Sequence, residues 1–243
     1  MERRQYLQHL EADGEALAAA GRKAPKAHVG SCPEWHMADL VGHLARVHRW
    51  ANQLVATGAT GYQKGPDCPT EGFDGLMAWY DEGLDELLAT FAATDLEAPV
   101  WNWADRGPGP ARFWARRMAH ETSVHRWDAQ AAAGTPQPIS PELAADGIDE
   151  YLGFVTRWLA RDPIAGLEGT LHLHATDGEG EWSMQLRPDG LDVVREHRKA
   201  DAAIRAPGSD LLLWLVNRVP VDSPGFEVFG QRELIDLWGK LKF

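Results

Sequence analysis

The chain has 243 residues, 44% of them hydrophobic, so it is long enough to form one large domain or two smaller domains with a hydrophobic core. Its 24 Lys and Arg residues stand against 36 Asp and Glu residues, and the resulting net charge of −12 argues against nucleic acid or an anionic membrane as a partner. The two cysteines, Cys32 and Cys68, form no Cys-x-x-Cys pair, which argues against a disulfide scaffold and fits a reducing compartment. The N-terminal residues lack an apolar signal segment, and the longest apolar run, Leu211 to Val216, is too short to cross a bilayer. We therefore expect a cytoplasmic protein.

The first half of the chain predicts four amphipathic helices. Apolar residues recur there at spacings of three and four, and Gly and Pro residues separate the segments. The expected helices span Glu2 to Ala20, Pro33 to Thr57, Phe73 to Phe91 and Ala111 to Ala133. The run Gly107-Pro108-Gly109-Pro110 is interpreted as a helix-breaking connection. Four such helices favour a four-helix bundle over a sheet-based fold.

The second half predicts a change to an α+β pattern. A fifth helix is expected from about Glu142 to Arg161, leading out of the bundle, and the pattern changes near Asp162-Pro163. Alternating strands with a hairpin turn at Asp177 to Gly180 follow. The expected strands are Thr170 to Ala175, Trp182 to Leu186, Leu191 to Val194 and Ala202 to Ile204, and the expected helices are Asp210 to Asn217 and Gln231 to Lys242. The predicted fold class is therefore α+β, with a helical bundle in residues 1–161 and a small α+β domain in residues 162–243.

Three side chains in the predicted bundle are candidate ligands for a divalent metal. Glu121 and His125 share one helix face at an i, i+4 spacing, and His43 lies on the apolar stripe of the second helix. One metal bound by all three would satisfy these inward-facing polar groups and leave a position for a reacting ligand. The spacing alone is weak, because Glu168 and His172 repeat it. A hydrogen-bonded core histidine and a helix-surface pair are the alternatives.

Three segments carry a resemblance to a known family. They are Cys32-Pro33-Glu34-Trp35 followed by Asp39-Leu40-Val41-Gly42-His43-Leu44, the stretch from Phe113 to Glu121 with His125-Arg126-Trp127-Asp128, and the stretch from Leu143 to Glu150. Over nearly its whole length the chain resembles the mycothiol-dependent maleylpyruvate isomerase family. The resemblance implies a DinB-like metal-binding helical bundle joined to a C-terminal domain related to sterol-carrier folds. It also implies a zinc ion held by His43, Glu121 and His125, with mycothiol as the thiol cosubstrate.

Residues around these ligands are open to two interpretations each. Asp128 and Asp39 lie one helical turn from a candidate histidine, so each could orient an imidazole or simply lie on the helix surface. Arg126 is interpreted as an ion-pair residue of the bundle surface. The resemblance places a basic residue at Arg218 near the active-site mouth, which makes it a candidate catalytic residue for binding a carboxylate, with a surface arginine as the alternative. Cys32 is interpreted as a turn or packing residue.

Further aromatic and histidine residues could take part in binding. Four of the 11 tryptophans lie near the proposed ligands in sequence, and most should pack between helices while one or two wall an apolar pocket. These four are Trp35, Trp50, Trp114 and Trp127. His172 and His174 would share one face of a strand, as a metal pair requires, but no acidic or cysteine residue stands beside them. An exposed sheet face is the favoured interpretation of this pair.

The expected function is that of a zinc-dependent enzyme that activates a low-molecular-weight thiol for addition to an electrophilic small molecule. If the thiol is released after addition the enzyme is an isomerase, and if the adduct is kept it is an S-transferase. Another divalent metal could replace zinc, and two histidines with a carboxylate also suit iron(II) and oxygen chemistry. A different class of function, a non-catalytic small-ligand binding protein with a structural bundle, would not need the three metal ligands. The expected partners are small molecules only, with neither nucleic acid nor a membrane.

Overall fold

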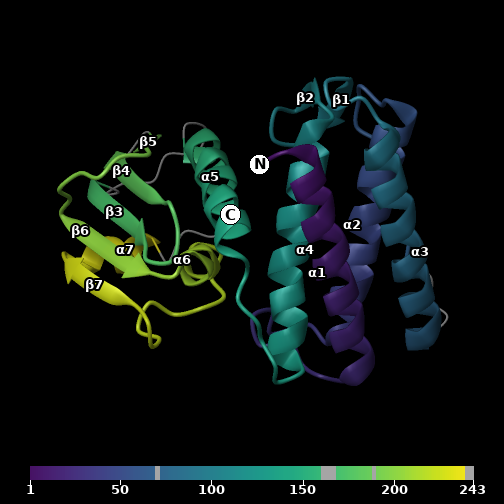
Figure 1. The fold of residues 1–243 in the computed structure, drawn as a ribbon, viewed down its shortest axis with the longest axis horizontal. Coiled ribbons are helices and arrows are strands. Elements are labelled where there is room, and N and C mark those ends of the chain that lie inside the picture. Colours follow the sequence, from purple (N-terminus) through teal and green to yellow (C-terminus); the bar gives the residue numbers. More distant parts are fainter. Residues whose placement is uncertain (69–71, 160–167, 188–189, 239–243) are drawn as a thin grey trace. The chain divides into compact units, whose positions relative to one another are not determined.

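The computed structural model describes residues 1–68, 72–159, 168–187 and 190–238 (Figure 1). The chain divides into two compact units, Met1–Gln137 and Pro138–Phe243. Helices make up most of the first unit, and the second combines helices with a five-stranded sheet, so the predicted α+β class is confirmed. Within the described ranges, no helix is long and apolar enough to span a bilayer.

The first unit is built on four long helices, α1 (Arg3–Lys23), α2 (Met37–Thr57), α3 (Gly72–Ala93) and α4 (Arg112–Ala132). Figure 1 shows them lying side by side as a bundle, with α1 against α4 and α2 against α3. Their inward faces carry fully buried apolar side chains, including Leu17, Leu44, Phe91 and Trp114. Burial of these stripes is what the spacing of three and four predicts.

Helix α2 begins four residues later than the sequence predicts. His36 is its N-cap, and the His36 backbone N–H donates to Asp39 Oδ2 at 2.9 Å in a capping box. The preceding residues instead form a tight loop, in which the N–H of Val29 donates to the Trp35 carbonyl at 2.9 Å and the N–H of Trp35 donates to the Cys32 carbonyl at 2.8 Å. This loop sets the position of Trp35.

A short hairpin joins α3 and α4. Strand β1 (Pro99–Asn102) pairs antiparallel with β2 (Gly107–Pro110), so the run that the sequence suggested as a helix-breaking connection is a strand. Proline is compatible with a strand where its missing N–H is not required by a neighbour, as at the edges of a two-stranded ribbon. Arg106 takes a positive φ of 54° just before β2.

The second unit places α5 (Pro141–Leu159) with the sheet rather than with the bundle. Helix α5 packs against α6 (Gly208–Leu215) and β5 (Gly190–Val194), which explains why the unit begins at Pro138. The boundary expected between residues 161 and 162 lies outside the described residues, as do the expected ends of the fifth helix at Arg161 and of the last helix at Lys242.

The sheet of the second unit has the strand order β5-β4-β3-β6-β7. The remaining elements are β3 (Gly169–Ala175), β4 (Glu181–Arg187), β6 (Ala202–Ala206), β7 (Glu227–Gly230) and α7 (Arg232–Trp238). Strands β3 and β6 are parallel, and the other neighbours are antiparallel. Strand β7 was not expected from the sequence, because Glu227–Gly230 is short and mostly exposed.

The two faces of this sheet differ in burial. Leu171, Leu173 and Ala175 of β3 are buried on one face, and helices α6 and α7 both contact β3 and β6. Because side chains alternate along a strand, His172 and His174 lie on the opposite face.

Candidate metal centre

The structure brings together the three side chains that the sequence proposed as metal ligands. His43 Nε2 lies 3.0 Å from Glu121 Oε1, and His125 Nε2 lies 3.3 Å from the same oxygen. The two imidazole centroids are 5.0 Å apart, and one donor atom from each of the three residues lies within 4.8 Å of the others. Two imidazoles and a carboxylate are a donor set that suits zinc and similar divalent cations.

Asp128 holds His125 in the orientation that a metal ligand needs. Its Oδ2 lies 2.9 Å from His125 Nδ1, and its Oδ1 accepts a hydrogen bond from the Ser31 hydroxyl at 2.6 Å. With the proton fixed on Nδ1, the Nε2 lone pair faces Glu121 and His43. Of the two aspartates that the sequence left undecided, Asp128 orients an imidazole, whereas Asp39 caps helix α2.

The electrostatic environment of His125 favours a positive charge. Burial lowers the pKa of this imidazole, but its hydrogen bonds to Asp128 and Glu121, together with the charges of both carboxylates, outweigh burial and raise the pKa to about 9. A metal ion competes with the proton for the same nitrogen. The surroundings that favour the imidazolium therefore also fit a bound divalent cation.

Glu121 is held in its ionised form. Burial raises the pKa of this carboxyl, but hydrogen bonds from His125 and His43 and the charge of Arg117 bring the pKa well below its usual value. An Arg117 guanidinium nitrogen lies 2.7 Å from Glu121 Oε2, one helical turn away on α4. Arg117 was not singled out from the sequence, although its i, i+4 spacing to Glu121 is a signal that could have identified it. It occupies one carboxylate oxygen and leaves the other facing the imidazoles.

An indole covers the two imidazoles. The Trp35 ring centroid lies 5.1 Å from that of His43 and 6.2 Å from that of His125. Trp50 and Trp114 pack against each other edge to face at 5.3 Å, as expected for indoles between helices.

A cleft of about 320 Å³ opens beside His43. It is lined by His43, Arg46, Val47, Trp50, Tyr62 and the segment Lys64 to Asp67. The Arg46 side chain donates through Nε to the Gly42 carbonyl at 3.3 Å and has no carboxylate partner among the residues that the structure describes. The cleft therefore combines aromatic walls with a cation beside the candidate metal ligands.

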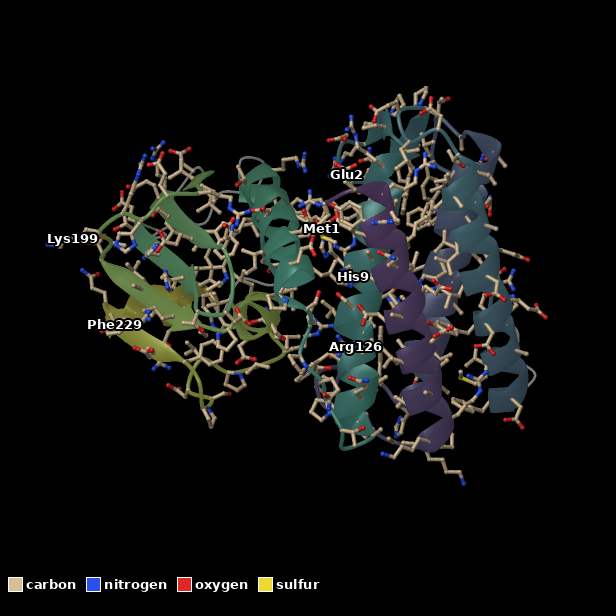
Figure 2. The ribbon with its side chains drawn as sticks, viewed as in Figure 1. Met1, Glu2, His9, Arg126, Lys199 and Phe229 are labelled. Carbon is tan, nitrogen blue, oxygen red and sulfur yellow. The ribbon has the colours of Figure 1, made fainter. Side chains whose placement is uncertain are left out.

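Arg126 does not lie on the bundle surface, as the sequence suggested, but is 4% exposed. Figure 2 shows it on α4, and its Nε donates to Asp13 Oδ1 on α1 at 2.9 Å. It remains an ion-pair residue, and its role is to join α1 to α4.

Arg218 belongs to the second unit and follows α6. It lines a cleft of about 360 Å³ together with Trp214, Asn217 and the segment Val219 to Asp222, as well as residues of α7. Its guanidinium donates to the Val216 carbonyl at 2.8 Å. The partly buried Arg218 side chain therefore lines this cleft.

The fold and the donor set define a class of protein: a four-helix bundle with a two-histidine, one-carboxylate centre, followed by an α+β unit. The chain belongs to the family of the mycothiol maleylpyruvate isomerases, because residues 7–130 match the family model described as the mycothiol maleylpyruvate isomerase N-terminal domain and residues 142–237 match the MDMPI C-terminal domain. The expected family is thereby confirmed.

Solved structures agree with this assignment at the level of the fold. The chain is similar to a mycothiol-dependent maleylpyruvate isomerase and to a point mutant of that enzyme, each at a TM-score of 0.64 and 14% sequence identity, with 94% of this chain and 93% of the other covered. No protein with a curated description matches the sequence.

Proposed function

We propose that this protein is a metal-dependent enzyme that activates a low-molecular-weight thiol, mycothiol or a close analogue, and adds it to an electrophilic small molecule. The observation that carries the proposal is the convergence of His43, Glu121 and His125 on one point beside an aromatic cleft, in a chain of the mycothiol maleylpyruvate isomerase family. Zinc is the metal that the donor set favours. When bound, such a metal supplies Lewis acidity that lowers the pKa of a thiol ligand.

The residues around the site have distinct tasks in this proposal. Asp128 fixes the tautomer of His125, and Arg117 fixes the orientation of the Glu121 carboxylate. Trp35 packs beside both imidazoles. The protein therefore needs no cysteine of its own as nucleophile, because the thiol comes from the cosubstrate.

The cleft beside His43 is the proposed place for the electrophile. Its aromatic wall, Trp50 and Tyr62, suits an unsaturated carbon skeleton, and Arg46 provides a cation for a carboxylate. We propose Arg218 as a second carboxylate-binding residue, through the guanidinium at the rim of its own cleft.

Two outcomes follow from addition of the thiol to a carbon–carbon double bond. In an isomerase, the new S–C bond breaks after rotation about the former double bond, and the thiol is returned unchanged. In an S-transferase, the S–C bond persists, the neighbouring carbon takes up a proton and one thiol is consumed per turnover. We propose the isomerase outcome first, because it is the reaction in the name of the similar solved enzyme.

The test is metal content and thiol-dependent turnover in wild type and in Glu121→Gln, purified without an affinity tag. Plasma mass spectrometry should find about one equivalent of zinc more in wild type than in Glu121→Gln, and a screen of unsaturated acids with mycothiol should find turnover in wild type only. The matched control is Glu82→Gln, which changes an exposed glutamate of α3. Full retention of metal and turnover by Glu121→Gln would overturn the proposal.

The same experiment separates the other candidate functions. Measurement of free thiol during the reaction distinguishes catalysis of isomerisation from S-transfer. Wild-type protein without metal, but with tight binding of an apolar ligand that Glu121→Gln preserves, would favour the ligand-binding function. Iron in place of zinc would favour oxygen chemistry.

A further inference from the structure

A second cluster of histidines around a carboxylate lies in the second unit, on the face of the sheet opposite to Leu171 and Leu173. His172 comes from β3, Glu181 is the first residue of β4, and His197 lies between β5 and β6. One donor atom from each of these residues lies within 4.8 Å of the others. The β-hairpin register pairs His174 with Glu181, so a fourth polar side chain adjoins the cluster. None of these residues takes part in the function proposed above.

His172 shows why the cluster needs a further partner. Its side chain is buried, with 5% of the residue exposed, and its Nε2 has no hydrogen-bond partner among the residues that the structure describes. Burial, together with the neighbouring His197, lowers the pKa of His172, so the imidazole is neutral at physiological pH. A buried polar nitrogen without a partner costs free energy, and a water or a metal ion bound to it would offset that cost.

Glu181 supplies the negative charge. Its Oε1 lies 2.7 Å from His174 Nδ1 and 3.0 Å from His197 Nδ1. These hydrogen bonds lower the pKa of the carboxyl, which is therefore ionised. The rings of His172 and His197 are in edge-to-face contact with centroids 4.9 Å apart. Two imidazoles thus meet one carboxylate, as at the centre in the bundle.

The arginines near the cluster are engaged with other carboxylates. Arg205, the β6 neighbour of His174, donates to Glu227 at 3.1 Å. Arg195, two residues before His197, donates to Asp149 at 2.7 Å. Hydrogen bonds from imidazoles therefore hold Glu181, and a metal would replace the one from His197.

We propose that His172, Glu181 and His197 form a second metal site, specific for a borderline divalent cation of the zinc type. His174 keeps its hydrogen bond to Glu181 and orients the carboxylate. Zinc bonds of about 2.0–2.2 Å require the donor atoms to move closer together, and the exposed His197 side chain is free to make this adjustment. The bound ion would link β3 and β4 to the segment that follows β5. Ser183 of β4 already contacts this segment, because its hydroxyl donates a hydrogen bond to the Glu196 carbonyl.

The test uses the full chain with the Glu121→Ala substitution, which removes the carboxylate of the first centre. Co²⁺ is the probe, because its visible absorption reports the ligands, and Zn²⁺ is then used to displace it. We expect one equivalent of Co²⁺ to bind with histidine-type absorption, and the additional substitution His197→Ala to weaken binding by at least about tenfold. His197 is 74% exposed through its side chain, so this substitution should not affect folding.

The matched control is Lys199→Ala, which changes another exposed residue of the same segment, labelled in Figure 2. This control should keep the affinity of the Glu121→Ala parent. If the parent binds no Co²⁺, or if His197→Ala and Lys199→Ala bind it equally well, the second site does not exist. Because the first centre is already disabled in every protein compared, the result does not depend on the proposed enzyme activity.

Discussion

The two clusters contain the same donor groups, two imidazoles and one carboxylate, in different surroundings. In the bundle, the His125 side chain is 8% exposed, Asp128 fixes its tautomer and Arg117 holds Glu121. In the sheet, His172 is equally buried, but the His197 side chain is 74% exposed and no carboxylate other than Glu181 is bonded to it within the described part of the chain. The two clusters therefore differ in how firmly the surrounding residues hold the ligands in place, and not in the type of ligand. We expect the bundle centre to bind a metal more tightly than the sheet cluster.

The largest expected effect is loss of metal from the bundle when a ligand is removed. His43→Ala deletes one of three donors, and we expect the zinc affinity of this centre to fall by at least about a hundredfold, since loss of an outer partner alone costs about 10–100-fold. Competition with a chromogenic chelator measures the change. His36→Ala, at an exposed histidine before α2, is the control. Equal affinities in both variants would show that His43 is not a ligand.

A smaller effect should come from the residue that orients His125. In Asp128→Asn the carboxylate that holds Nδ1–H is lost, and zinc affinity should fall by about 10–100-fold with the helix intact. Asp39→Asn is the matched control, because it alters the cap of α2 instead. That change should lower stability by up to about 1 kcal/mol and leave zinc affinity unchanged. If the two variants lose zinc to the same extent, the preorganisation of the bundle centre does not depend on Asp128.

Acid should destabilise the bundle through its buried His48. Burial is the main cause that lowers the pKa of His48 from 6.5 to about 3, so the unfolded chain takes up this proton first as the pH falls. The folded state should lose about 2 kcal/mol between pH 6.5 and pH 5 from this group. Urea unfolding of wild type and His48→Gln over this range, both with chelator, measures the effect. The variant should show the shallower slope, and identical slopes would contradict the assignment.

The smallest effect is expected in the cleft beside the bundle centre. Arg46→Gln removes a cation that faces the proposed electrophile, and the KM for an acidic substrate should rise by up to about fivefold with little change in kcat, the range of an exposed ion pair. Steady-state kinetics at saturating thiol measure both parameters. Arg112→Gln, at an exposed arginine of α4, is the control. A fall in kcat without a change in KM would place Arg46 in a different role.

Only the Glu121–His125 pair of the bundle centre has a geometry that the sequence shows locally, and the full set of three candidate ligands came from the family resemblance. Glu121 and His125 are one turn apart on a single helix, and the motif around His43 identified the second helix. The sheet cluster depends instead on register, which places Glu181 opposite His174 across a hairpin. The sequence showed both histidines and the turn, and counting residues across that turn would have revealed Glu181. His197 comes from a separate segment, and its position had no comparable signal.

The fold was predictable to a similar extent. Apolar periodicity predicted the long helices. The strand at Gly107 to Pro110 was not predicted, because its glycine and proline residues do not reveal that the segment pairs with Pro99 to Asn102. The start of α2 was missed because the capping box of His36 and Asp39, rather than Pro33, sets the first turn.

The loop that precedes α2 contacts the candidate metal ligands of the bundle centre, so its backbone should respond when a cation binds there. The Ser31 hydroxyl donates to Asp128, which in turn holds His125, and the Trp35 indole of the same loop rests on both imidazoles. The N–H groups of Val29 and Trp35 are bonded within the loop. Occupancy of the centre should therefore be recorded in the hydrogen-exchange rates of these amides, and in the emission of Trp35, which makes the loop a built-in reporter of whether a cation is present.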